Sequence, residues 1–493
     1  MQISTYSQSL NMRTNLSQLQ TRLADLEKQL STGYKADSFS ALGDGRNLVL
    51  ALNNQIDQSN SYLDTINMTQ TRVQASSDAL TRLNDIASEM KTGGLTSQFD
   101  LTSGGQTSLQ TSAGMRLGEV VDLLNLNVAD RQLFGGKDTQ TVPVETPDMI
   151  LNGDTTHAGL KQVISERAQA DLGDGHGRLV LSSPTSTSVS LAEDASPSPF
   201  GFKLSNVSSS LTGATVTGPT GTPAALGVDF GSPLPNPGDS ISVDLNLPDG
   251  TSTTLKLTAT TANPPGVGQF TIGVDAASTA TNFMSALDTG IQGAAQTTLK
   301  AASATQAGND FFSNPPVRVT GPNFATATAT QSGTTADTVF WYKGDTTGTA
   351  GNNFVATIGD GSQVAYGARA DQSALRTVLQ NTAVLAAVTY SASDPNASAS
   401  YAALTQRTSS ALAFDGTQSV QDVVTDLGLK SASLDTAKIN LQTQISTSQS
   451  LLDNTQNADT YSVATQLTTL VTQLQASYQV TASLSKLSLA SYL

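Results

Sequence analysis

Few side chains in this sequence are of the types that usually carry catalysis or hold metal ions. The chain of 493 residues has no cysteine and two histidines, His157 and His176. Without cysteine, a disulfide framework, a zinc–thiolate site, an iron–sulfur cluster or a cysteine nucleophile is impossible. Both histidines lie in turn-like sequence, so we do not expect a catalytic Ser-His-Asp triad.

The closest grouping of possible metal ligands is Asp171, Asp174 and His176 in the segment DLGDGHGR. These side chains could hold a cation, but their spacing is not that of a calcium loop, and a glycine-rich turn accounts for them better. The segment from Gly135 to Asp138 likewise lacks the spacing and the hydroxyl residue of a phosphate-binding loop. We therefore expect no metal site and no phosphate site.

The aromatic run Phe340, Trp341 and Tyr342 contains the single tryptophan of the chain. It could form a binding platform, but large aromatic side chains dominate core burial, so we expect the core anchor of a small domain. With no motif that meets the spacing rules of a catalytic site, we expect no enzyme, no catalytic residue and no cofactor.

The charge balance argues against two classes of partner. The chain carries 25 Lys and Arg against 40 Asp and Glu, a formal net charge of −15. Binding to nucleic acid or anionic lipid depends largely on Lys and Arg contacts to phosphate, so neither partner is expected. No apolar stretch of about 18 residues exists, so membrane insertion is not expected. The N-terminal residues also lack the pattern of a cleaved signal peptide.

Proline divides the chain into two ends and a centre. All 17 prolines fall between Pro143 and Pro395. Because proline breaks helix interiors, the proline-free ends are predicted to be helical and the centre irregular or β-rich. In the centre, residues 241–247 alternate apolar and polar, and a turn at 248–250 precedes renewed alternation, which predicts a β-hairpin. Further strands are predicted at 179–181 and 189–191, and helices at about 281–302 and 371–388.

Both ends show leucine spacings typical of long helices that pack on other helices. A stripe through residues 12–30 stops at Gly33. Further helices are predicted at about 48–90, 106–134 and 420–452, and from Asp459 to the terminus. A period near 3.5 residues favours coiled-coil packing, although an ordinary antiparallel bundle would give similar stripes.

The positions beside these stripes are mostly Gln, Ser, Thr and Asn, as at Gln18, Gln29, Thr443, Gln444 and Thr447. Coiled coils usually place Glu and Lys there. A flank of uncharged side chains can be packed from several sides without burying unpaired charge. We interpret these as helices that contact more than one neighbour; a solvated polar face is the alternative.

Several segments together resemble one known family. They are LEKQLSTGYKADSFSALGDGRNLVLALNNQI at 26–56, ADRQLFGGKD at 129–138, FWYKGD at 340–345, VAYGARADQSALR at 364–376 and YSVATQLTTLVTQLQASYQVTASLSKLSLASYL at 461–493. In these segments the chain resembles the bacterial flagellin superfamily, which includes filament flagellins and the related hook–filament junction protein, hook-associated protein 3. Residues 159–182 resemble the inserted domain of flagellins from α-proteobacteria.

The resemblance implies a structural subunit that polymerises through its terminal helices into the flagellar filament for swimming motility. Members of the family are exported unfolded through the flagellar type III apparatus without a cleaved signal, to an extracellular location. Their first and last helices fold together on assembly as concentric inner tubes. The implied partners are further copies of the chain, the hook-associated proteins, the export apparatus and an export chaperone.

Two departures from ordinary filament flagellin keep an alternative open. Residues 35–39 read KADSF, where a pair of aspartates followed by small residues is usual. Residues 133–136 and 487–493 are more similar to the junction protein. The length and the large insertion favour a filament subunit, so the junction protein is the alternative and a secreted adhesin a more distant one.

The expected fold class is α+β, with long N- and C-terminal coiled-coil helices packed together and mixed β-rich outer domains inserted between them. The expected domains are 1–45 with 456–493 (terminal helical inner tube), 46–140 with 400–455 (helical coiled coil), 141–335 (inserted β-rich outer domain) and 336–399 (small α/β outer subdomain). The residues expected to carry inner-tube assembly are Leu16, Leu19, Leu23, Leu26, Leu30, Leu467, Leu470, Leu474 and Leu484. Those expected in the second layer are Ile66, Val73, Leu80, Leu434, Leu441 and Ile445.

Overall fold

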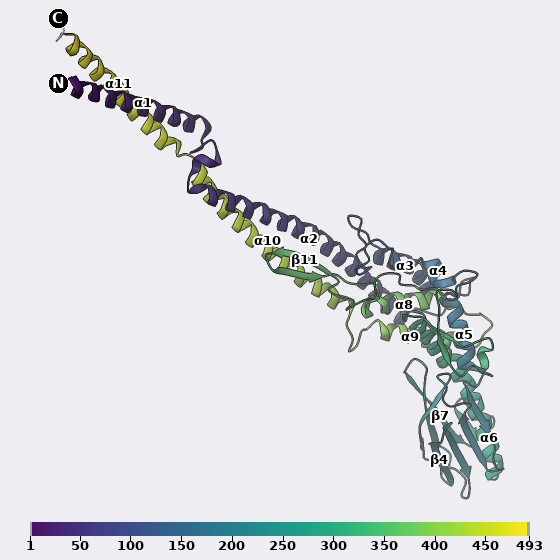
Figure 1. Cartoon of the computed structure of the whole chain (residues 1–493). Coiled ribbons are helices and arrows are strands. Elements are labelled where there is room, and N and C mark those ends of the chain that lie inside the picture. Colours follow the sequence, from purple (N-terminus) through teal and green to yellow (C-terminus); the bar gives the residue numbers. More distant parts are fainter. Residues whose placement is uncertain (1, 491–493) are drawn as a thin grey trace. The chain divides into compact units, whose positions relative to one another are not determined.

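The computed structural model describes residues 2–490 (Figure 1), and the chain divides into two compact units. Unit 1 contains the described residues up to Gln70, Ala356–Val364, and the described residues from Ala432 onward. Unit 2 contains Thr71–Val355 and Ala365–Ser431. The mixed composition of long terminal helices and intervening β-sheets confirms the predicted α+β class.

The helices of the two ends agree with the leucine stripes. They are α1 (Gln2–Thr32), α2 (Gly45–Thr96), α10 (Val420–Gln456) and α11 (Thr460–Ala490), and a short 3₁₀ helix, η1 (Phe39–Leu42), follows α1. Gly33 ends α1 with φ +76°, a backbone conformation that glycine adopts without steric cost. Asp459 begins α11, because its Oδ1 accepts the backbone N–H groups of Tyr461 and Ser462 at 3.0 and 3.1 Å.

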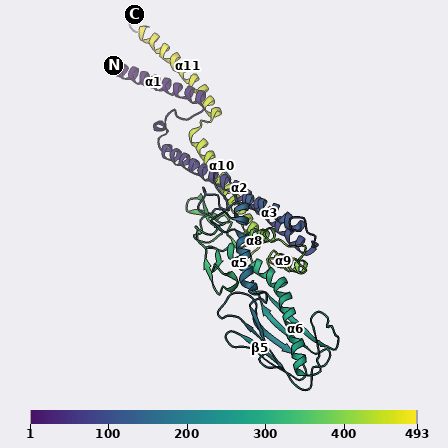
Figure 2. The ribbon, with the colours of Figure 1, turned by 90° about the vertical axis from the view of Figure 1, so that its right-hand side faces the viewer.

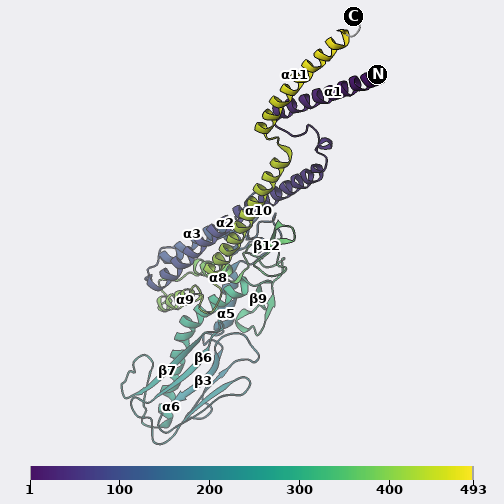
Figure 3. The same ribbon diagram turned by 90° about the vertical axis from the view of Figure 1, so that its left-hand side faces the viewer.

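Within unit 1, α1 and α11 run antiparallel and side by side (Figures 1 and 3). The chain segments that follow α1 and precede α11 are joined by an antiparallel bridge between Tyr34 and Asn457. In the same place the backbone N–H of Ala458 donates to the Gly33 carbonyl at 2.8 Å. A second apolar cluster, of Val49, Leu52 and Leu452, lies where α2 and α10 meet inside this unit.

The predicted helix at 106–134 is wrong beyond residue 124. The observed α3 (Ser108–Leu124) begins at a capping box formed by Thr107 and Gln110 and stops at Asn125. The Asn125 side chain exchanges two hydrogen bonds of 2.9 Å with the backbone of Val144. This long-range contact holds residue 125 outside the helix, and local leucine spacing carries no information about it.

The β-rich part of unit 2 holds two four-stranded sheets. One has the order β1 (Leu179–Ser182), β2 (Ser188–Glu193), β5 (Ala225–Phe230) and β4 (Ala214–Thr220). The other has the order β3 (Lys203–Ser209), β6 (Ser240–Asn246), β7 (Ser252–Thr260) and β8 (Gln269–Thr271). All pairs are antiparallel except β7 with β8. The predicted hairpin is β6–β7, with Val243 opposite Leu255.

One long helical segment packs on both sheets. It starts as α6 (Ala276–Ala294), passes through a π-helical turn, η2 (Ala295–Leu299), and continues as α7 (Lys300–Phe311). Figure 2 shows α6 beside the strands. Phe283, Leu287 and Ile291 of α6 are buried together with Phe230 and Phe270 of the sheets. The predicted helix at 281–302 is therefore longer than expected, because Asp275 caps its start and the segment continues to Phe311.

The remaining elements of unit 2 surround this segment. They are α4 (Pro147–Asn152), α5 (Leu160–Leu172), β9 (Val317–Val319), η3 (Phe324–Thr326), β10 (Thr330–Ser332), α8 (Ser373–Ala387) and α9 (Ala397–Ala411). A hairpin of β11 (Phe354–Gly359) and β12 (Ser362–Tyr366) spans residues of both units. The predicted helix at 371–388 is confirmed as α8.

Candidate functional site

The candidate site is the contact between α1 and α11, where most of the predicted inner-tube leucines meet. Leu26 of α1 is buried against Val463 and Leu470 of α11. The partly buried side chains packed on this cluster include Leu19, Leu23 and Leu467. At about 1.5–3 kcal/mol for each fully buried leucine, this small seam stabilises the helix pair modestly.

The other predicted inner-tube residues differ in their environment. Leu474 is also buried, and Leu16 is half-buried. Leu30 is 41% exposed, so it lies at the edge of the seam. Leu484 belongs to α11, but its side chain lies outside the described part of the chain.

Polar groups also cross between α1 and α11. The Gln20 Nε2 atom donates to the Tyr478 hydroxyl at 2.9 Å. The Thr481 hydroxyl lies 3.5 Å from the sulfur of Met12. These contacts involve uncharged side chains, so the pair is held by apolar burial and neutral hydrogen bonds with little dependence on salt.

The predicted second-layer residues lie on α2 and α10. In unit 1, Ile66, Leu434 and Leu441 are buried and Ile445 is half-buried. In the same unit, Gln70 of α2 donates from Nε2 to an Asp435 carboxylate oxygen of α10 at 2.5 Å. Val73 and Leu80 are buried in the part of α2 that belongs to unit 2.

Unit 1 also exposes many large apolar side chains. Most of the exposed large apolar residues of the described chain belong to this unit, although it is much the smaller of the two. They are Tyr6, Leu10, Leu30, Tyr34, Leu48, Leu50, Met68, Ile439, Leu451, Tyr461, Tyr478 and Val480. Exposed apolar surface is typical of sites of protein association where it is contiguous, so unit 1 is the candidate region for such a site.

Several threonine hydroxyls on the polar faces of α10 and α11 are hydrogen-bonded within their own helix. On α11, the hydroxyls of Thr465, Thr468 and Thr472 each donate to the carbonyl four residues earlier, at 2.9 Å. On α10, Thr443 and Thr447 do the same at 2.9 Å. Such side chains present a methyl group outward and can be covered by a neighbour without leaving a hydroxyl donor unpaired.

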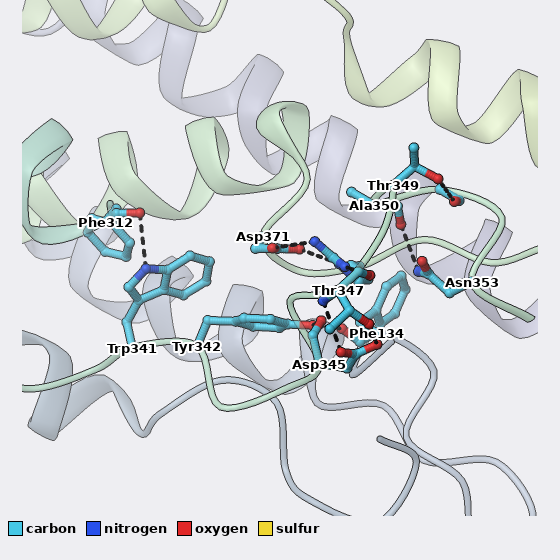
Figure 4. Close-up of polar contacts among 12 residues, drawn as sticks. Phe134, Phe312, Trp341, Tyr342, Asp345, Thr347, Thr349, Ala350, Asn353 and Asp371 are labelled. Carbon is cyan, nitrogen blue, oxygen red and sulfur yellow. Dashed lines mark hydrogen bonds and ion pairs between the residues drawn. The ribbon is translucent and has the colours of Figure 1, made fainter. Parts of the chain in front are cut away.

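Trp341 and Tyr342 of the aromatic run are core residues, as expected (Figure 4), whereas Phe340 is half-buried. Trp341 and Tyr342 are buried, and the indole Nε1 atom donates to the Phe312 carbonyl at 3.1 Å. The Tyr342 hydroxyl donates to the Asp345 carbonyl at 3.2 Å, and burial raises the pKa of this hydroxyl.

The segment DLGDGHGR is divided between two sets of internal contacts. Asp171 is buried and accepts from Arg167 at 2.8 Å and from the Gly201 backbone at 2.9 Å. His176 lies 3.0 Å from an Asp174 oxygen and 2.9 Å from an Asp288 oxygen. Burial by itself lowers the pKa of His176, but the two carboxylates outweigh it and the pKa is raised.

Sequence reasoning missed a buried ion-pair group. Arg167 is 4% exposed and contacts Asp171, the Asp310 carboxylate at 3.0 Å and the Pro199 carbonyl at 3.0 Å. Burial raises the pKa of Asp310, although Arg167 acts in the opposite direction. The four-residue spacing of Arg167 and Asp171 in the sequence could have indicated this ion pair, because such residues lie on the same face of a helix. Among the described residues, no group of three or more His, Asp or Glu is arranged to hold a metal ion.

Two other features of the described residues bear on the class of protein. No described helix combines the length and the apolar character needed to cross a membrane. The features that stand out are paired terminal helices of low charge, apolar side chains left exposed on them, and a separately folded region inserted between them.

Comparison with known proteins identifies the family. Residues 3–139 match the bacterial flagellin N-terminal helical region, which here corresponds to α1, α2, α3 and the loop after α3. This match over the N-terminal part of the chain supports membership of the bacterial flagellin superfamily and a role as a flagellin-type structural protein of the flagellum. No curated protein matches the chain.

Proposed function

We propose that this protein is the subunit of the flagellar filament and that it polymerises with copies of itself through its N- and C-terminal helices. The observation that carries the proposal is the concentration of exposed apolar side chains on the sparsely charged helices of unit 1. A single α1–α11 pair buries one small leucine cluster, so most of this surface is without cover in one chain. Neighbouring copies would cover it, at about 25 cal/mol per Å² of apolar surface.

The internally bonded threonines support the same proposal. A helix that is surrounded by other subunits needs faces that can be buried on several sides. The back-bonded hydroxyls of α10 and α11 meet this need, because their burial leaves no hydroxyl donor without a partner. A helix face that is exposed only to solvent would normally carry more charged side chains than these faces do.

The layer arrangement and the partners are part of the proposal. Residues 1–45 with 456–493 would form the inner tube, and 46–140 with 400–455 the layer around it. Residues 141–335 and 336–399 would form outer domains. The hook-associated proteins, the flagellar export apparatus and an export chaperone would be the other partners, and the exported protein would act outside the cell.

Seeded polymerisation tests the proposal. The purified full chain should extend filament seeds into tubes visible by electron microscopy. A truncation that lacks residues 467–493 should fail to do so, because it removes the α11 half of the leucine seam. Fluorescence of Trp341, which is buried in unit 2, should stay unchanged in the truncated protein. Normal polymerisation of the truncated chain would contradict the proposal.

The hook–filament junction protein is the second candidate. Residues 133–136, LFGG, and 487–493, LSLASYL, favour it by their similarity to that protein. The two candidates differ in copy number, since a filament subunit makes up most of the flagellum and a junction protein contributes few copies. Quantitative mass spectrometry of sheared flagella separates them: a protein that is a minor component by mass is the junction protein.

A further inference from the structure

Unit 2 has a groove of about 780 Å³ between β7, the loop from β7 to β8, and α6. Leu255 and Leu257 line it from the sheet, and Ala286, Gly290 and Gly293 line it from the helix. The three helix residues recur at the four- and three-residue spacing that places them on one face of α6. A Cβ atom added at Gly293 would meet no atom within 4 Å, so there is open space here, whereas one added at Gly290 would meet the Leu255 side chain at 2.8 Å.

The groove lining excludes several ligand classes. It contains no charged and no aromatic side chain, so ion pairing and stacking on a ring are both absent from its lining. In the groove, the hydroxyls of Ser285 and Thr289 already donate hydrogen bonds to the carbonyls four residues earlier, at 3.1 and 2.9 Å. Phosphates and carboxylates find no counter-charge here, and sugars find no ring on which to stack.

The strand that borders the groove has an open edge. β7 pairs with β6 from Ser252 to Thr258, but β8 pairs with it over Thr258–Thr260 alone. The Thr258 N–H points to the β8 side, where it donates to the Gly268 carbonyl at 2.9 Å. Because backbone groups alternate along an antiparallel strand, those of Thr254 and Lys256 point to the same side, beyond the end of β8.

We propose that this groove binds an extended, uncharged peptide segment of another protein, which adds to β7 as a further strand in line with β8. The backbone of the segment would pair with Thr254 and Lys256. Alternate apolar side chains would contact Leu255 and Leu257, with room provided beside Gly293. Strand addition takes its affinity from main-chain hydrogen bonds and its specificity from pockets for alternate side chains. This activity is separate from polymerisation, since it uses none of the terminal helices.

The test is a titration of the full chain with short uncharged peptides that carry apolar residues at alternate positions, such as acetyl-NTVTVTN-amide, followed by calorimetry. Hydrogen exchange measured by mass spectrometry should slow over residues 252–257 when the peptide is bound. G293L should weaken binding at least about tenfold, because the leucine fills the groove. G114L on α3 also adds a side chain where a Cβ would meet no atom within 4 Å, and it should bind like the wild type.

A second variant tests the backbone pairing itself. K256P removes the N–H that points to the open edge and leaves the β6–β7 bonds in place, so peptide binding should be lost. K256T keeps the N–H and should retain binding, which separates loss of the amide from loss of the lysine. Unchanged binding in both G293L and K256P would overturn the proposal. Absence of peptide binding would also overturn the proposal, even if the groove binds the neutral dye Nile red.

Discussion

At the residue scale, the side chains that first suggest chemistry are held in structural contacts. Trp341 is buried and bonded to the Phe312 carbonyl, and Asp171 is neutralised by Arg167. His176 joins the turn after α5 to α6 through Asp174 and Asp288. The Trp341 and His176 contacts reach segments distant in the chain, and the Arg167–Asp171 pair lies within α5, so these residues serve to stabilise unit 2.

Replacement of Trp341 by phenylalanine should destabilise unit 2. The change removes the indole N–H that donates to the Phe312 carbonyl and part of a buried ring, so we expect a loss of about 1–3 kcal/mol in the free energy of unfolding. Urea unfolding followed by circular dichroism measures it. Phe340→Leu at the half-buried neighbour is the control and should cost less. Equal costs would show that the indole hydrogen bond contributes nothing.

His176 should make the stability of unit 2 depend on pH. Its folded pKa is raised above the ordinary value of 6.5, so the protonated form is bound more favourably in the folded state. The stability that it contributes is fully present below pH 6.5 and is lost as the pH rises through the folded pKa. The melting temperatures of wild type and His176→Gln should therefore differ most at about pH 5.5 and converge at higher pH. A difference that does not change with pH would contradict this assignment.

At the element scale, local signals set where the terminal helices begin and end. Gly33 ends α1, and Asp459 begins α11 through two backbone N–H groups. In contrast, α3 stops at Asn125 because of a contact with Val144, and α6 continues into α7 beyond its predicted end. The end of α1 and the start of α11 are thus readable from local residues, whereas the end of α3 depends on a tertiary contact. The Asp275 cap at the start of α6 is also local, but the prediction missed it.

The cap of α11 gives a prediction at this scale. Asp459→Ala removes the side-chain acceptor for two N–H groups and should destabilise α11 by about 0.5–2 kcal/mol. If α11 carries assembly, the critical concentration for polymerisation should rise. Asp459→Asn keeps an oxygen acceptor and should behave nearly as the wild type. An unchanged critical concentration in Asp459→Ala would argue against a role of the α11 start in assembly.

At the scale of the whole molecule, the two units differ in how far their apolar side chains are buried. Unit 2 buries a core of two sheets and α6. Unit 1 leaves apolar side chains exposed and satisfies its threonine hydroxyls internally. The helices on which further copies are proposed to pack are also sparsely charged.

A charge placed on the polar face of α10 tests this division. Thr447 is exposed and belongs to unit 1. Thr447→Lys should leave the melting temperature of the monomer nearly unchanged, since exposed substitutions cost within about 0.5 kcal/mol. It should nevertheless raise the critical concentration for polymerisation, because the lysine would be buried between subunits without a partner. The control is Ser208→Lys, which places the same charge at an exposed position of β3. This variant should polymerise normally. Normal polymerisation of Thr447→Lys would show that this face of α10 remains in solvent.

The sequence by itself determined the long helices, the β6–β7 hairpin and the aromatic anchor at Trp341. These features depend on periods of two to four residues, on glycine and aspartate at helix ends, and on the burial of large rings. The chain has no cysteine and only two histidines, and this limits the chemistry that its side chains can carry out. The resemblance to flagellin, carried by short segments in a fixed order, was confirmed over residues 3–139.

The tertiary structure decided which strands pair, where α3 ends and which leucines meet. The pairing of β2 with β5 and of β3 with β6 joins segments separated by other strands, so it depends on the whole core and not on local alternation. Leu26 and Leu30 share one stripe in the sequence, yet one is buried and the other exposed, because α11 covers only part of α1. The groove beside β7 likewise depends on the shortness of β8 and on the open space beside Gly293 of α6. Local sequence encodes the period of an element, whereas contacts between distant segments decide what each face of it meets.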